Sequence, residues 1–297
     1  MIVAIGEVVW DIFPDREVLG GAPVNVAYHL AAQGLAVRVI TRVGRDGLGD
    51  ATLARLAQLA LPLAGVQRDE ELATGRVRVT FGPDREPRYE IVAPAAWDNI
   101  DPAAALATVG DQPYALVFGT LAQRDPRSRL AIRALAAQAL TCFYDVNLRP
   151  PFTTRELVLE SLALADLVKV NGEELRQLAV WLDLPGVPED AGEPDSPPGE
   201  LVISRDQEQL AAAIRERYGL AALVITEGAA GAWVRTASAT QSVPGEPVAV
   251  ADTVGAGDAF FAALIAAYQE KLPWPEILRR ANRRGAYVAS RPGATPP

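Results

Sequence analysis

Residues 251–268 are ADTVGAGDAFFAALIAAY, and the rest of the chain is best interpreted from this stretch. Two glycines flank Ala256 just before a long apolar run, a pattern that predicts a tight turn opening into a buried helix. The start of a helix exposes backbone N–H groups without intrahelical partners, and the peptide dipoles add positive potential there. The turn Gly255-Ala256-Gly257 is therefore expected to receive an anion such as a phosphoryl group.

Asp258 follows the second glycine and is expected in the first turn of this helix. Two interpretations are open. A carboxylate at this position can simply stabilise the helix start. It can also act as a general base beside a bound phosphoryl group, in which case the stretch indicates phosphoryl transfer. The rest of the chain favours the second interpretation.

The composition sets broad limits. The 297 residues, 49% of them hydrophobic, are sufficient for a single domain spanning 1–297 with a full core. A net charge of −9 argues against nonspecific binding to nucleic acid or to an anionic membrane. The single cysteine, Cys142, excludes an internal disulfide and lies in an apolar run, so we expect it to be buried. Without a basic leader or a long uncharged apolar run, a cytoplasmic enzyme is expected.

Apolar strands and helical stretches alternate along most of the chain, from MIVAIG at 1–6 to DLVKVN at 166–171. This alternation predicts a three-layer α/β/α fold with a parallel sheet and helices on both of its faces. Ligands bind such sheets at the carboxyl ends of the strands. We therefore expect one pocket built from the polar residues that follow the strands, which are Gly119-Thr120, Asp145-Asn147-Arg149, Asn171-Glu174 and Thr226-Gly228.

Two runs break this alternation. Residues 74–81 (TGRVRVTF) and 88–92 (RYEIV) alternate polar and apolar side chains, with the turn-forming Gly82-Pro83-Asp84 between them. Period two predicts an antiparallel hairpin with one solvated face. We interpret it as part of a small antiparallel β lid formed by about 9–20 and 74–98, with Tyr89 facing the ligand. Exposed lid edges also predict a homodimer through the lid.

A second glycine-rich entrance precedes the helix expected from Val24 to Gly34. Gly20-Gly21-Ala22-Pro23 would let a ligand approach the backbone closely, with the polar side chains of Asp11 and Asn25 on either side. Together these two side chains can accept hydrogen bonds from hydroxyl groups and donate to them. The alternative is an ordinary turn with a capping asparagine.

Other signatures of phosphate or metal chemistry are missing. There is no Walker-type P-loop, and the chain has only two lysines, Lys169 and Lys271. The sole histidine, His29, lies within a predicted helix and is expected to be packed there rather than catalytic. Phosphate chemistry would therefore rely on backbone amides, Asp258 and a magnesium ion.

Taken together, these segments resemble the ribokinase-like, or PfkB-type, sugar kinases. The resemblance covers nearly the whole chain: GGAPVN at 20–25, the lid hairpin, Asn171-x-x-Glu174, Thr226-x-Gly228 and DTVGAGD at 252–258. DTVGAGD with its following helix is the most specific of these segments. The resemblance implies that the γ-phosphate of ATP is transferred to a sugar hydroxyl, with Mg²⁺ as a cofactor and K⁺ as a further one.

The resemblance also implies residue roles. Asp258 resembles the base, with Gly255, Ala256 and Gly257 as the anion hole. The implied substrate contacts are Asp11, Gly21, Asn25, Tyr89 and Arg149. The implied nucleotide contacts are Asn171, Glu174, Thr226, Gly228, Gly231 and Asn282. Glu174 would hold Mg²⁺ through water, and Asp252 with the carbonyl of Val254 resembles a potassium site.

The sugar is less well defined by these segments. GGAPVNVAYHLA and AAWDNI look most like bacterial fructokinases, whereas Asp145-x-Asn147-x-Arg149 is shared with 2-keto-3-deoxygluconate kinases. Those kinases usually carry an arginine two residues after the lid tyrosine, but Tyr89 is followed by Glu90 and Ile91. An added carboxylate and a missing cation disfavour a sugar acid. We expect fructose, with the sugar acid and a nucleoside as alternatives.

A competing class is a catalytically silent sugar-binding sensor on the same scaffold. Glu227 within the Thr226-x-Gly228 turn departs from the family pattern and would weaken nucleotide binding under this interpretation. The presence of Asp258 argues against a sensor, because such a protein has no use for a base at an anion hole.

Overall fold

The computed structural model describes residues 1–81, 87–185 and 201–296. The described residues form two compact units, Met1–Leu140 and Thr141–Pro297, hereafter unit 1 and unit 2. A single domain over 1–297 stays a prediction.

Unit 1 contains a parallel sheet of continuous apolar strands. β1 (Ile2–Ile5) lies between β4 (Val37–Gly44) and β8 (Ala115–Gly119), and β5 (Val66–Asp69) pairs with the far side of β4. β1 is buried throughout, as a strand covered on both faces should be. The helices of this unit are α1 (Ala22–Ala31), α2 (Gly47–Gln58), α3 (Pro102–Val109) and α4 (Pro126–Ala136), with the 3₁₀ turns η1 (Ala96–Asn99) and η2 (Leu121–Gln123).

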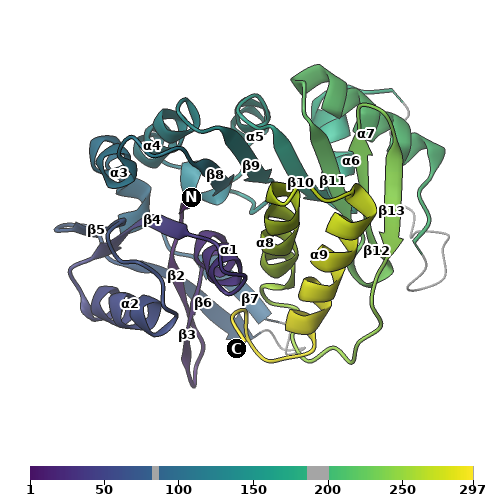
Figure 1. Ribbon diagram of the computed structural model, residues 1–297. Helices are drawn as coiled ribbons and strands as arrows, with labels where there is room; N and C mark the ends of the chain where they lie inside the picture. Colours follow the sequence, from purple (N-terminus) through teal and green to yellow (C-terminus); the bar gives the residue numbers. More distant parts are fainter. Residues whose placement is uncertain (82–86, 186–200, 297) are drawn as a thin grey trace. The chain divides into compact units, whose positions relative to one another are not determined.

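A second, four-stranded sheet in unit 1 is the predicted lid (Figure 1). It comprises β3 (Glu17–Gly20), β2 (Val9–Ile12), β6 (Gly75–Phe81) and β7 (Pro87–Ile91), in that order. The predicted hairpin is confirmed, because β6 and β7 pair antiparallel and buried Val77 and Val79 alternate with exposed neighbours. Its turn, Gly82-Pro83-Asp84, lies outside the described residues. The central pair, β2 and β6, is parallel, since the lid is assembled from two separate hairpins.

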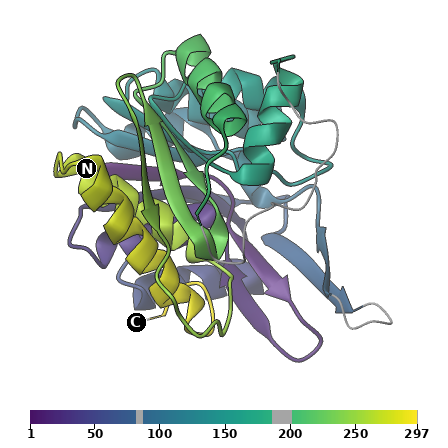
Figure 2. The same cartoon turned by 90° about the vertical axis from the view of Figure 1, so that its right-hand side faces the viewer.

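Unit 2 carries the second half of the alternating pattern. β9 (Thr141–Asp145), β10 (Leu167–Asn171) and β11 (Ala222–Thr226) are parallel, and β12 (Gly231–Thr236) and β13 (Thr240–Pro244) continue the sheet antiparallel. Figure 2 shows α9 alongside the green strands β12 and β13. The helices are α5 (Arg155–Leu162), α6 (Gly172–Trp181), α7 (Arg205–Tyr218), α8 (Ala256–Gln269) and α9 (Trp274–Ala289), with the 3₁₀ turn η3 (Gly228–Ala230).

The helices begin in different ways, and α9 starts at Pro273 without a side-chain cap hydrogen bond. Helices α2 to α7 begin at Asp, Thr, Asn or Ser residues whose side chains accept a backbone N–H of the first turn. Helices α1 and α8 instead begin at Gly21 and Gly255, both with positive φ and without a side-chain cap hydrogen bond. These are the two glycine-rich helix starts at which the sequence predicts a ligand.

Two minor predictions are also met. Cys142 is buried, and this burial is the main reason that its thiol pKa rises to about 12, which leaves it inert. His29 is fully buried in α1, with its ring edge-on to Tyr28. Among the described residues, every helix is too short or too polar to cross a lipid bilayer.

Candidate active site

The predicted anion turn lies at the start of α8 in unit 2. Gly255 is the N-cap with φ of 75°, a left-handed conformation that favours glycine. A Cβ at Gly255 would come within 2.4 Å of the Cβ of Ala294, so the turn is pressed against the C-terminal segment. The Ala256 N–H donates to the Thr253 carbonyl at 3.2 Å. The N–H groups of the next residues in the first turn are therefore better placed than that of Ala256 to receive an anion.

Asp258 lies in this first turn and is half-buried rather than turned into the interior. The helix that carries it is held firmly, because residues 259–267 are buried. Near the other end of α8, the Tyr268 ring packs edge-on against Phe143 of β9, with ring centroids 5.7 Å apart. A carboxylate at a rigid, positively polarised helix start is well positioned to serve as a base beside a bound anion.

Asp252 organises the loop that leads into the turn. One of its carboxylate oxygens accepts the Val254 N–H and the other accepts the Gly293 N–H, each at 3.0 Å. The side chain of Val254 is 49% exposed. Asp252 therefore joins the loop before α8 to the C-terminal segment that also contacts Gly255.

Asn171 and Glu174 form a reciprocal capping box at the start of α6. The Asn171 side chain accepts the Glu174 N–H at 2.8 Å, and the Glu174 carboxylate accepts the Asn171 N–H at 2.9 Å. The other carboxylate oxygen of Glu174 accepts the N–H of Leu148 at 2.8 Å. Burial, followed by repulsion from Asp145, raises the pKa of Glu174. Glu174 thus links the ends of β9 and β10.

The predicted nucleotide residues after β11 adjoin this box. Thr226 pairs in register with Asn171, and its hydroxyl donates to the Val170 carbonyl at 3.4 Å. Gly228 and Gly231 have φ of 55° and 122°. Gly228 has open space where a Cβ would be, whereas a Cβ at Gly231 would lie 2.4 Å from the Val243 carbonyl oxygen. Gly228 is therefore the more accessible of the two to a ligand. Glycine is needed at position 231 because a side chain there would clash with the neighbouring backbone.

Asn282 lies on α9 and is buried. Its amide nitrogen donates to the carbonyls of Val243 and Pro244, each at 3.0 Å. The side chain therefore fixes the end of β13 to α9, and the predicted contact with adenine would have to use its oxygen.

Arg149, the predicted substrate contact, is exposed beyond the end of β9. Its guanidinium donates to the Leu148 carbonyl at 2.9 Å, and its backbone N–H donates to the Thr153 hydroxyl. Asn147 just before it has φ of 40°. Local contacts thus fix the chain that follows β9, and the Arg149 guanidinium lies at the surface.

The sequence interpretation missed a buried ion pair in unit 2. Lys169, in the middle of β10, donates to both carboxylate oxygens of Asp145 at 2.9 and 3.0 Å. Both side chains are less than a tenth exposed. The signal was present in LVKVN, where a single charge interrupts a buried apolar strand.

The predicted substrate residues Asp11, Gly21 and Asn25 all lie in unit 1. Burial raises the pKa of Asp11, on lid strand β2, to about 6. Gly21 has φ of 115°, and a Cβ there would lie 2.5 Å from the Glu7 carbonyl oxygen. Asn25 is buried on the first turn of α1, and its N–H donates to the Gly21 carbonyl. The chain path there requires glycine at position 21, and contact of Asp11, Gly21 and Asn25 with a substrate stays a prediction.

Tyr89 on β7 is 58% exposed and pairs across the lid with Val79. The neighbouring Glu90 points to the other face, where its carboxylate lies 3.3 Å from Arg78. A ligand-facing role for Tyr89 stays a prediction.

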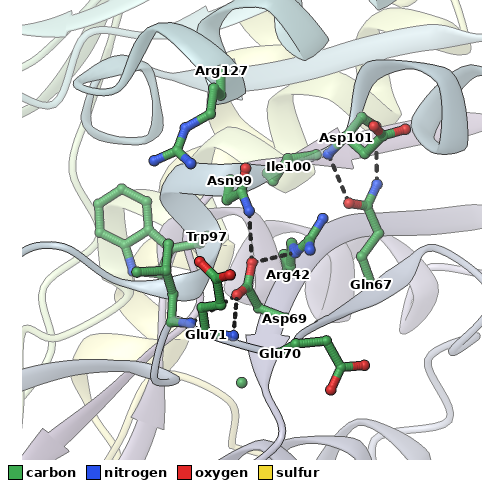
Figure 3. Close-up of polar contacts among 12 residues, drawn as sticks. Arg42, Gln67, Asp69, Glu70, Glu71, Trp97, Asn99, Ile100, Asp101 and Arg127 are labelled. Atoms are coloured by element: carbon green, nitrogen blue, oxygen red, sulfur yellow. Dashed lines mark hydrogen bonds and ion pairs between the residues drawn. The ribbon is translucent and has the colours of Figure 1, made fainter.

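The chain just after the lid is held by buried ion pairs. Arg124 donates to both oxygens of Asp98 at 2.8 Å and stacks over the Trp97 ring. Asn99 donates to Asp69, whose carboxylate also pairs with Arg42 at 2.7 Å (Figure 3). These contacts fix η1 to the parallel sheet of unit 1. They also anchor the chain where it leaves lid strand β7.

A model of the pfkB family of carbohydrate kinases matches residues 6–297. The chain belongs to this family. Fructokinase-2 of Zea mays is 28% identical over 328 residues, covering 100% of this chain and 90% of that protein. A fructokinase of Vibrio alginolyticus is 26% identical, covering 97% of this chain and 92% of the relative.

Solved structures share the fold of this pfkB-family chain. The fructokinase from Xylella fastidiosa with bound ATP superposes with a TM-score of 0.82 at 22% identity, covering 99% of this chain and 93% of that one. The fructokinase from Vibrio cholerae in its fructose, ADP and calcium ion bound form gives 0.80 at 24% identity, with 99% and 94% coverage. An aminoimidazole riboside kinase from Salmonella enterica gives 0.78 at 24% identity, with 99% and 95% coverage.

The family match establishes a sugar kinase and the ribokinase-like fold that the sequence predicted. Of the four polar segments predicted to follow strands and form one pocket, Gly119-Thr120 belongs to unit 1 and the other three belong to unit 2. Within unit 2, Asn171, Glu174 and Thr226 lie at neighbouring strand ends, as expected. The single pocket formed by all four stays a prediction.

Proposed function

We propose that this sugar kinase transfers the γ-phosphoryl group of ATP to a hydroxyl of fructose. The observation that carries the proposal is Asp258 in the first turn of α8, three residues after the N-cap Gly255, which has a left-handed backbone and no side-chain cap. The relatives named fructokinase, in both plants and bacteria, support the choice of sugar at 25–28% identity.

The chemistry requires one proton transfer and one exchange of bonds. The sugar hydroxyl gives its proton to the Asp258 carboxylate, and its oxygen forms a bond to the γ-phosphorus. The bond from that phosphorus to the β,γ-bridging oxygen breaks, and its electron pair leaves with ADP. The N–H groups at the start of α8, which lack a side-chain cap, would hold the negative phosphoryl oxygens during the transfer.

We propose that Glu174, whose two oxygens accept the N–H groups of Asn171 and Leu148, also holds a magnesium ion through water. The described residues contain no group of three or more His, Cys, Asp or Glu side chains able to hold a metal. Mg²⁺ bound to phosphates keeps several waters and needs only one or two carboxylates, so a dedicated cage is unnecessary. When bound, the ion would neutralise part of the phosphate charge. A potassium ion at Asp252 and the Val254 carbonyl is proposed by the same resemblance, and Asp252 is already ordered there by two backbone N–H groups.

Fructose is favoured over a sugar acid by the charges near the predicted substrate residues. Glu90 of the lid is paired with Arg78. The position two residues after Tyr89 is Ile91, so it carries no cation that could bind an acid. Asp11 would repel a carboxylate substrate once ionised, but it can accept hydrogen bonds from neutral hydroxyls. The riboside kinase among the fold neighbours keeps a nucleoside as the second candidate.

The test is ADP release coupled to NADH oxidation, with fructose, ribose, 2-keto-3-deoxygluconate and adenosine as acceptors. We expect fructose to give the highest kcat/KM and to require added Mg²⁺. A preference for the sugar acid or for adenosine would reject the choice of substrate. Sugar-independent ADP release, or none at all, would reject the kinase.

We further propose that the kinase forms a homodimer through the lid, because β3 and β7 leave strand edges at the two sides of that sheet. Light scattering should then give twice the chain mass of 31.6 kDa. A monomeric mass would end this proposal without touching the others.

A further inference from the structure

Lys169 is a buried cation close to the anion turn of unit 2, Gly255-Ala256-Gly257. It is one of only two lysines in a chain that otherwise uses arginine for positive charge. Burial by itself lowers a lysine pKa, but the attraction of Asp145 and Glu174 outweighs that effect and raises the pKa of Lys169. The side chain therefore carries its charge at neutral pH.

The ammonium group lies against the anion turn itself. A Cβ built on Gly257 would be 3.7 Å from the Nζ of Lys169, which is ordinary van der Waals contact. The same Nζ lies 6.0 Å from the ring centroid of Phe261, one helical turn further along α8. The cation thus supports the first turn of α8 from the side of β10.

Three carboxylates act on this one cation. Asp145 of β9 is in direct contact, and the charges of Glu174 on α6 and Asp258 on α8 also attract it. A pair of apolar side chains would usually stabilise a fold as well as a buried ion pair does. Stability alone therefore does not account for a lysine at this position, whereas its place beside the turn and Asp258 does.

We propose that Lys169 is a positioning residue for phosphoryl transfer: its charge attracts the Asp258 carboxylate and adds positive potential beneath the Gly255-Ala256-Gly257 turn. This inference rests on the proposed function of that turn. Asp145 then has the supporting role of keeping the ammonium group in place.

The test compares Lys169→Met, the double variant Asp145→Asn/Lys169→Met, and Lys271→Gln as a control. The double variant removes both charges, so no unpaired carboxylate is left buried. We expect its kcat to fall roughly tenfold to a hundredfold, less than for loss of a direct oxyanion donor, with KM for fructose and ATP within about threefold. Lys271 is exposed, and its variant should match the wild type.

If the double variant regained the kcat of the wild type, Lys169 would only neutralise Asp145, and the inference would be overturned. A double variant that fails to fold or to bind ATP would overturn it as well, because the pair would then be a structural requirement. These outcomes are separate from failure of the proposed function. That failure would appear in the wild type, as absent sugar-dependent ADP release.

Discussion

Two polar regions of this kinase use their backbone N–H groups in opposite ways. In the Asp69 cluster of unit 1 (Arg42, Asp69 and Asn99), the carboxylate also accepts the N–H groups of Glu71 and Leu72 at 2.9 and 2.7 Å. In the turn before α8 of unit 2, the helix begins at Gly255 without a side-chain cap. The first region caps its loop N–H groups with a buried carboxylate, whereas the second begins a helix with no side-chain acceptor.

A related contrast appears between the pKa values of two carboxyl groups within unit 1, Asp69 and Asp11. Asp69 is almost completely buried, which would raise its pKa, but the hydrogen bonds from Leu72, Asn99 and Glu71 and the charge of Arg42 together lower it. Burial is not offset at Asp11, whose pKa rises to about 6. A buried carboxylate whose hydrogen bonds and ion pair offset its burial stabilises the fold. A carboxylate whose burial is not offset, and whose pKa is therefore raised, is a candidate ligand contact.

The largest effect on stability is expected in the Asp69 cluster. Asp69→Ala leaves Arg42 and the loop N–H groups without their acceptor and should cost roughly 3–5 kcal/mol of unfolding free energy in urea titrations. Asp50→Ala, which removes an exposed partner of Arg68, is the control and should cost less than about 1 kcal/mol. Equal losses in the two variants would show that the Asp69 cluster is not structural.

The anion turn should tolerate no side chain at Gly255. Gly255→Ala is expected to cost about 2–4 kcal/mol, from its positive φ and from the clash with Ala294. Gly34→Ala is a matched control, because Gly34 has φ of 82° with nothing within 4 Å, and should cost only about 1–2 kcal/mol. Unfolding titrations that give the same cost for both would mean that the contact with Ala294 contributes nothing.

Asp11 should make sugar affinity depend on pH. Below its pKa of about 6 the carboxyl loses its charge, so KM for fructose should rise toward tenfold per pH unit, about 1.4 kcal/mol. Stability should change in the opposite direction. A raised pKa contributes stability that is complete below the ordinary value of 3.8 and is lost as pH rises through about 6. Asp11→Asn should abolish both dependences, and a variant that kept them would point to another group.

The smallest effect is expected on the exposed face of the lid. The Arg78 and Glu90 side chains are 62% and 67% exposed, so Glu90→Gln should change stability by less than about 0.5 kcal/mol. Its informative readout is acceptor choice. If the Glu90 carboxylate helps to exclude acids, the variant should phosphorylate 2-keto-3-deoxygluconate measurably better relative to fructose, and an unchanged ratio would remove Glu90 from substrate selection.

Sequence patterns predicted the elements that depend on local chemistry. The glycines of DTVGAGD mark the start of α8, and period-two alternation located β6 and β7. Continuous apolar runs located β1, β8, β9 and β10. Each of these signals lies within a few residues of the feature that it specifies.

Features that depend on pairing between distant segments were not predictable in this way. The short strand β5 and the edge strand β13 have no distinctive period, and the parallel pairing of β2 with β6 joins residues far apart in the chain. The amide of Asn282 is engaged by β13, and Lys169 meets Asp145 across two strands. Composition alone does not reveal such partners.

The central claim is that Asp258 is the base of a sugar kinase, and fructose-dependent ADP release by Asp258→Asn tests it most directly. The account predicts a kcat lower by about 10²- to 10⁴-fold, because the amide cannot accept the hydroxyl proton. Fructose and ATP binding, measured by calorimetry on the same preparation, should be retained. An Asp258→Asn protein that released ADP at close to the wild-type rate would contradict the account.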